Sequence, residues 1–157
     1  MKSNFLNIYN NLIKLTRNKN LYFKLEKQDT FSDRLVILFF HFSFYLKTYK
    51  NVISKKDSQG LFDYVIRQIE LSLREVGLGD VSVNKKMKEL VNLFYSIISN
   101  IDSWEVKNIK SRGYLIGNYL NTDKNLEFYA NYFEKYRIFL TKSTLNSFSK
   151  DIINFKF

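Results

Sequence analysis

The chain has 157 residues and a formal net charge of +10 at pH 7. It contains no cysteine and one histidine, which excludes a disulfide framework, a thiol nucleophile and a zinc cluster of the usual Cys/His kind. A chain of this size can build a sizeable core, because a domain of about 150 residues buries about 70% of its unfolded surface. Proline is absent and there are only five glycines, so helices can run long. We therefore expect an all-α, single-domain helical bundle over residues 1–157.

The N-terminal region lacks the continuous apolar stretch of a signal peptide, because Asn and Lys interrupt its apolar positions up to Thr16. We expect this segment to remain in the mature protein. The pattern predicts a first helix over Asn4–Asn18 and a short second helix over Leu21–Lys27. Gln28 and Asp29 are expected to form the turn that follows.

The next helix carries the most apolar stretch of the chain. Thr30 is a candidate N-cap, and Asp33, three residues later, completes a capping box. The predicted helix spans Phe31–Val52. Its apolar core, Leu35–Leu46, is about a dozen residues long, whereas a bilayer span needs about 20. Because this helix is apolar on nearly all sides, we expect it at the centre of the bundle.

After a polar break over residues 54–60, the spacing predicts an amphipathic helix over Leu61–Val76. Its apolar positions lie three and four residues apart: Phe62, Val65, Ile66, Ile69, Leu73 and Val76. The opposite face carries acids four residues before bases, as in Asp63 with Arg67 and Glu70 with Arg74, an arrangement that favours ion pairs. Gly77 is expected to end the helix, because glycine adopts the left-handed conformation readily.

Further helices follow towards the C-terminus. Ser82 is a candidate cap for a helix over Val83–Trp104, which is expected to bury one apolar face made of Met87, Leu90, Val91, Phe94, Ile97, Ile98 and Ile101. A shorter helix is predicted over Ser111–Asn121, containing Gly113 and Gly117. Thr122 or Asp123 then caps a helix that reaches about Leu140, and Ser143 starts a last one. The total is seven or eight helices, with three long ones forming the core.

The helix after Thr122 carries two apolar stripes. Leu126, Tyr129, Ala130, Phe133 and Leu140 form the first, and Phe128, Tyr132 and Phe139 form the second. Two stripes indicate either deep burial or an exposed patch that a partner covers. We favour burial, because aromatic residues make up 17% of the chain.

The sequence contains no motif for a catalytic, nucleotide-binding or metal site: no phosphate-binding Gly-rich loop, no dinucleotide fingerprint, no His-Glu-x-x-His and no nucleophile elbow. His41 is the only side chain suited to proton transfer near neutral pH, but it lies in the most apolar helix. We interpret it as a core histidine, with a contact or ligand role as the alternative. No catalytic residue, metal or cofactor is predicted.

The segment from Arg74 to Lys88 is the most unusual of the chain. Gly77 and Gly79 indicate a tight corner between two helices, and that structural role is one sufficient explanation. The same segment contains Lys85, Lys86 and Lys88 in what we expect to be the first two turns of the second helix. The helix dipole disfavours cations there by about 0.3–1 kcal/mol. We hypothesise that the corner contacts an anionic partner.

The basic charge by itself allows two interpretations. It favours attraction to phosphates, acidic proteins or anionic membrane surfaces. It is equally explained by a composition rich in Lys, Asn, Ile, Phe and Tyr, which is typical of AT-rich genomes. Only local clustering of charge therefore counts as evidence for a binding surface.

Several of these segments together resemble the ubiquinol–cytochrome c chaperone family. The resemblance lies in the Asp29-Thr30-Phe31 start of the apolar helix with His41, the segment Leu73–Lys88, Phe94-Tyr95 and Ile101-Asp102. It extends weakly through Leu126–Leu140 and so covers about residues 20–140. The most distinctive part is Arg-Glu-x-Gly-x-Gly-Asp-x-Ser-Val-x-Lys-Lys-Met, which begins at Arg74. The chain departs from the family by lacking a proline before Asp29 and a tryptophan near His41.

The resemblance implies a non-enzymatic chaperone that binds newly made, haem-poor cytochrome b during assembly of the bc1 complex (complex III). It also implies a possible small partner subunit, proximity to the ribosome, and a location in the cytoplasm at the face of the inner membrane, or on the matrix side in mitochondria. We take as candidate contacts Arg74, Glu75, Gly77, Gly79, Asp80, Val81, Lys85, Lys86, Lys88 and His41.

The main rival is a nucleic-acid-binding or ribosome-binding helical module, suggested by the basic charge and the abundant aromatic residues. Such a module needs exposed aromatic side chains interleaved with basic ones. Here most aromatic residues fall on apolar helix stripes, so we do not expect DNA binding. An enzyme is less compatible still, because one histidine and no cysteine leave few routes to acid–base or nucleophilic chemistry.

Overall fold

The computed structural model describes residues 2–25, 30–150 and 155. Over these residues the chain forms eight α-helices and one short 3-10 helix, with no strand, which confirms the all-α prediction. The elements in chain order are α1 (Lys2–Thr16), α2 (Asn20–Phe23), α3 (Phe31–Tyr49), α4 (Lys55–Glu75), α5 (Asp80–Ile101), the 3-10 helix η1 (Trp104–Val106), α6 (Ile109–Leu120), α7 (Leu126–Lys142) and α8 (Leu145–Lys150).

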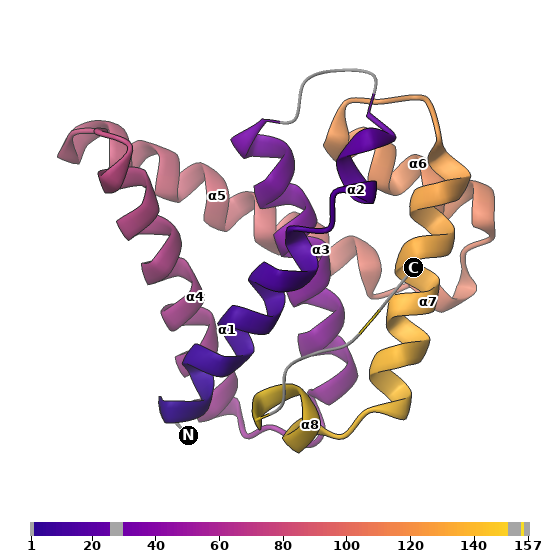
Figure 1. Cartoon of the computed structure of the whole chain (residues 1–157), viewed down its shortest axis with the longest axis horizontal. Helices are drawn as coiled ribbons and strands as arrows, with labels where there is room; N and C mark the ends of the chain where they lie inside the picture. Colours follow the sequence, from indigo (N-terminus) through magenta and orange to yellow (C-terminus); the bar gives the residue numbers. More distant parts are fainter. Residues whose placement is uncertain (1, 26–29, 151–154, 156–157) are drawn as a thin grey trace.

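Helix α3 lies at the centre of the bundle, as predicted (Figure 1). It begins with the expected capping box, in which the Thr30 hydroxyl accepts from the Asp33 amide and the Asp33 carboxylate accepts from the Thr30 amide. It packs against α1, α5, α6 and α7. Its phenylalanines meet aromatic rings from several of these helices, for example Phe40 with Phe133 at a centroid distance of 5.3 Å. Aromatic packing around α3 therefore organises the core.

Helices α6 and α7 form a tight hairpin on one side of α3 (Figure 1). Gly113 and Gly117 lie directly against the start of α7. A Cβ at position 117 would lie 2.5 Å from Leu126 Cδ2, and one at position 113 would lie 2.9 Å from Leu126 Cβ. The two glycines are needed because only their missing side chains allow this approach.

A partly buried polar cluster links the end of α5 to this hairpin; we call it the Trp104 cluster, made of Trp104, Arg112, Glu134 and Arg137. The Trp104 indole donates to the Glu134 carboxylate at 2.8 Å, and Arg112 pairs with the same carboxylate at 2.8 Å. Arg137 binds its other oxygen. Burial alone would raise the pKa of Glu134, but the hydrogen bonds from Arg137 and Trp104 outweigh it and lower that pKa. The cluster thus keeps Glu134 charged and fixes η1 against α7.

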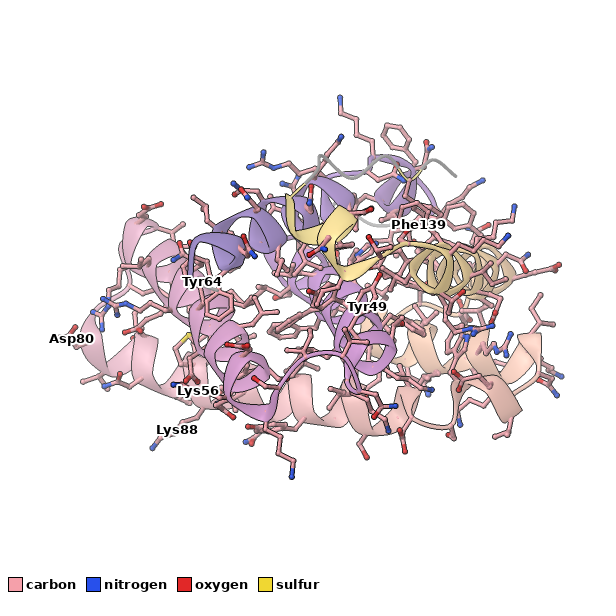
Figure 2. The ribbon with its side chains drawn as sticks, turned by 90° about the horizontal axis from the view of Figure 1, so that it is seen from below. Tyr49, Lys56, Tyr64, Asp80, Lys88 and Phe139 are labelled. Carbon is pink, nitrogen blue, oxygen red and sulfur yellow. The ribbon has the colours of Figure 1, made fainter. Side chains whose placement is uncertain are left out.

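Helices α4 and α5 form an arm on the other side of the molecule (Figure 1). Helix α4 packs against α5 and α1, and the Tyr64 ring meets Tyr9 of α1 edge-on at 6.1 Å. The corner where α4 turns into α5 lies at the far end of this arm. Figure 2 shows Asp80 at that end and Lys88 extending from α5.

The helix boundaries of this arm differ from the prediction. The polar stretch over residues 54–60 is no break, because Ser54 caps α4 and its hydroxyl accepts from the Asp57 amide at 3.1 Å. Gly60 consequently lies inside the helix. Helix α5 begins at Asp80 with Gly79 as its N-cap, so Ser82 is not a cap. Its other end also differs, since α5 stops at Ile101 and the tryptophan belongs to η1.

Smaller differences occur elsewhere. Helix α2 is shorter than predicted, and the expected turn at Gln28 and Asp29 lies outside the described residues. Asn125, in the left-handed conformation with φ 57°, precedes α7 in place of Thr122 or Asp123. Thr144 precedes α8, and its hydroxyl accepts from the Ser147 amide at 3.0 Å. Ser143, which was predicted to start this last helix, ends α7.

Burial follows the predicted faces with exceptions. Leu90, Phe94, Ile97 and Ile101 are buried, as expected. The half-buried exceptions on α5 are Met87, Val91 and Ile98. The second stripe of α7 is covered, as favoured: Tyr132 is buried, while Phe128 and Phe139 are half-buried. Phe155 contributes to this cover, with its ring centroid 5.1 Å from that of Phe139.

Candidate functional site

The corner between α4 and α5, residues 74–88, contains nine of the ten candidate contacts. Gly77 ends α4 as predicted, with φ at +95°. Its amide donates to the Arg74 carbonyl at 3.0 Å, and the amide of Leu78 donates to the Leu73 carbonyl at 3.4 Å. These two bonds form a Schellman motif, which requires the left-handed conformation at Gly77. The corner therefore has a defined backbone.

Arg74 connects the two helices across this corner. Its guanidinium donates to the Asp80 carboxylate at the start of α5 and to the Glu70 carboxylate at 3.1 Å. Hydrogen bonds to Asp80 and then to Glu70 raise the pKa of Arg74, and hydrogen bonds from Arg67 and Arg74 lower the pKa of Glu70. The predicted pair of Glu70 with Arg74 is thus present. Arg67 binds Glu70 rather than Asp63, at 2.9 Å.

The three lysines of the corner do not lie where the dipole argument placed them. Because α5 begins at Asp80, Lys85, Lys86 and Lys88 lie in its second and third turns. The dipole effect decays within the first turn, and that turn holds Asp80, the favoured acid. The predicted local cost is therefore absent, and this correction removes one reason for a partner. Lys85 and Lys88 remain exposed, while Lys86 is half-buried and lies 3.8 Å from Glu89.

The corner exposes three apolar side chains, of which only Val81 was among the candidate contacts. Val81 is 85% exposed and Val76 is 71% exposed, although Val76 was expected on the apolar face of α4. Leu78 is 39% exposed. Because side chains four and seven residues apart share a helix face, Val81 lies on one face of α5 with Lys85 and Lys88. Sequence reasoning missed Val76 and Leu78, and their place on either side of Gly77, where α4 ends, is a signal that could have indicated their exposure.

His41 lies away from this corner, in the core. It is fully buried; Ile37 O lies 2.8 Å from its Nδ1, and the Tyr132 hydroxyl lies 2.7 Å from its Nε2. A carbonyl only accepts, so Nδ1 carries the proton and Nε2 accepts from Tyr132. Burial lowers the pKa of His41 to about 3, against an opposing backbone hydrogen bond to Ile37. This supports the core interpretation, and a buried ring cannot contact a partner directly.

The described residues offer neither a metal-binding cluster nor a membrane-spanning helix. No group of three or more His, Asp or Glu side chains is positioned to hold a metal ion in the described residues. None of the described helices combines the length and apolar character that crossing a bilayer requires.

The described residues thus form a small all-α bundle with a defined, exposed corner of mixed apolar and basic character. The model of the ubiquinol–cytochrome C chaperone family matches residues 23–111, more than half of the chain, and the chain belongs to this family. Comparisons with curated proteins and with solved structures gave no match.

The matched residues contain α3, α4, α5 and the whole corner, and they end before α7. The match therefore covers less than the expected resemblance up to Leu140. Membership in the family supports a chaperone role in the assembly of the bc1 complex.

Proposed function

We propose that this protein is a non-enzymatic assembly chaperone that binds newly made cytochrome b through the corner at residues 74–88. The observation that carries the proposal is the exposed apolar tip of Val76, Leu78 and Val81 inside the family-matched segment. Exposed apolar side chains at a protruding junction are suited to a polypeptide partner. Membership in the family supports a client related to the bc1 complex. The exposed apolar tip supports the corner as the surface that contacts it.

The chemistry of the corner favours a segment that is apolar with acidic flanks. The exposed valines offer apolar area, and Lys85 and Lys88 lie beside Val81 on α5. The Schellman motif and the bridge from Arg74 to Asp80 hold the backbone in place. A partner would thus meet a preorganised surface, which lowers the entropy lost on binding.

Further partners follow from the family and the charge. We propose peripheral contact with the inner membrane on its cytoplasmic side, or on the matrix side in mitochondria. A small partner subunit and the ribosome are additional candidates. The basic net charge of +10 favours each of these contacts at low ionic strength.

The first experiment reverses charge at the corner. Lys85→Glu combined with Lys88→Glu should reduce recovery of newly made cytochrome b with the tagged chaperone about tenfold, and the remaining binding should depend less on salt. The matched control is Lys55→Glu with Lys56→Glu, which changes the net charge equally at two exposed lysines near the start of α4. Equal recovery with both double variants would contradict an electrostatic contact at the corner.

The second variant tests the apolar part. Val76→Ser with Val81→Ser removes exposed apolar area without opening the core, so the melting temperature should change little while recovery of the client falls. If neither this variant nor the charge reversal weakens client binding, the corner is not the docking surface.

The role in assembly is tested separately from the surface. Deleting the gene should lower both cytochrome b abundance and bc1 activity, and the wild-type gene should restore them. Normal levels of both after deletion would refute the function, whatever the corner binds.

A further inference from the structure

A cleft of about 520 Å³ lies between α1, α3 and α4, apart from the exposed tip of the corner. The apolar part of its lining includes Ile13 of α1, Leu35 and Leu38 of α3, and Ile69 of α4. The volume lies within the range of about 300–1,000 Å³ typical of small-molecule sites. The helices that form the cleft come from three separate parts of the sequence, so no local sequence motif predicts it.

The edge of this cleft is positively charged. Lys14 of α1, Arg17 directly after α1, and Arg34 of α3 line it, and all three are exposed. No carboxylate occurs among the described residues that line the cleft. Arg34 is held in place by its guanidinium lying over the Tyr22 ring, 5.6 Å from the centroid. The cleft thus combines an apolar interior with a cationic rim.

A buried hydroxyl in the wall provides an independent observation. Thr16 lines the cleft and is 6% exposed. Its Oγ1 is buried and has no hydrogen-bond partner in the structure. A buried hydroxyl without a partner is unfavourable, and native proteins nearly always satisfy such groups. The atom is shielded from solvent in this conformation, so an oxygen-bearing ligand in the cleft would provide the missing partner once the Thr16 side chain turns towards it.

Tyr9 places a second polar group at the cleft. Its pKa is raised by burial, by the neighbouring Tyr64 and by the charge of Glu75, while the charge of Arg17 acts in the opposite direction. Tyr9 supplies a hydrogen-bond donor to the cleft lining, which suits an anionic head group.

From these features we propose that the cleft binds a single-chain anionic amphiphile, such as a fatty acid. Its carboxylate lies between Arg17 and Arg34 within reach of the Thr16 hydroxyl, and its chain lies along Ile13, Leu38 and Ile69. This site is separate from client binding at the exposed tip, and either can fail without the other.

The test is calorimetric titration of the full-length protein with dodecanoate below its micelle concentration. Saturable binding with a stoichiometry of one is expected, and 1-dodecanol should bind at least tenfold more weakly. Arg17→Gln with Arg34→Gln should weaken dodecanoate binding at least tenfold. The control Lys55→Gln with Lys56→Gln removes the same charge elsewhere and should leave binding unchanged.

A further variant separates ligand binding from folding. Thr16→Val removes the unpartnered hydroxyl, so it should raise the melting temperature of the free protein while it weakens dodecanoate binding severalfold. Absence of saturable binding, equal affinity for dodecanol, or equal affinity in the two arginine and lysine double variants would overturn the proposal. So would binding only to an acidic peptide or to intact anionic vesicles, with none to monomeric dodecanoate.

Discussion

The buried histidine makes the stability of this protein depend on pH in a range where few other groups titrate. His41 has a folded-state pKa of about 3, against an ordinary value of 6.5. Below pH 6.5 the unfolded chain therefore binds a proton that the folded protein excludes. Unfolded molecules then bind more protons than folded ones, so the free energy of unfolding falls as the pH falls.

The size of the effect follows from this difference. Each pH unit between the unfolded and folded pKa changes the stability by at most about 1.4 kcal/mol, so the loss from pH 7 to pH 5 is about 2 kcal/mol. His41 is the only histidine. The carboxyl groups with shifted pKa values are Glu70, Glu105 and Glu134, and all three pKa values are lowered. For Glu105 and Glu134, hydrogen bonds from lysine or arginine outweigh the effect of burial. These carboxyl groups therefore titrate below this window.

The assay is urea unfolding at several pH values between 7 and 5, for the wild type and for His41→Gln. The variant is expected to lose about 1–3 kcal/mol at pH 7, because its hydrogen bonds to Ile37 and Tyr132 change. Its stability should nevertheless be flat across the window, while that of the wild type declines. An equal decline in both proteins would show that another group is responsible and would refute the assignment to His41.

Two further substitutions test the α6–α7 side of the bundle. Gly117→Ala places a Cβ 2.5 Å from Leu126 Cδ2 and should lower the free energy of unfolding by about 1–3 kcal/mol, measured by chemical denaturation. The control Gly79→Ala, whose Cβ would have nothing within 4 Å, should lower it less. Equal losses would contradict the close approach. Glu134→Gln removes the negative charge of the Trp104 cluster and should lower the free energy of unfolding by about 1–2 kcal/mol at pH 7. Unfolding is monitored by Trp104 fluorescence. Because the pKa of Glu134 is lowered by hydrogen bonds that outweigh burial, its contribution is present above pH ~4.3 and is lost as the pH falls. A difference from the wild type that stays constant down to pH 3 would contradict this.

Local signals predicted the features that depend on near neighbours. The capping box of Thr30 and Asp33 lies within four residues, and it starts α3 as expected. Gly77 ends α4 for an equally local reason, its positive φ. The apolar surroundings of His41 along α3 were sufficient to place it in the core.

Other features depend on contacts between distant residues, and these the sequence could not predict. Gly60 resembles a helix breaker, yet α4 continues through it, and the Phe5 ring of α1 lies 3.1 Å from where its Cβ would be. The cost of glycine in a helix, about 1 kcal/mol, is offset when a distant side chain uses the space. Apolar periodicity likewise assigned Val76 to a buried face, although α4 ends there and the described residues leave it 71% exposed.

The corner remains a proposed site, but the physical reason for proposing it has changed. With Asp80 as the first residue of α5, the lysines incur no dipole penalty, so charge alone no longer distinguishes the corner from other exposed lysines. What distinguishes it is the combination of exposed Val76 and Val81 with a backbone held by the Schellman motif. A structural role explains the glycines of this corner but not its exposed valines, and exposure alone does not single the valines out, since Val106 is 86% exposed elsewhere in the bundle. Under the proposed function, a polypeptide partner would bury the apolar tip on a surface that needs no rearrangement.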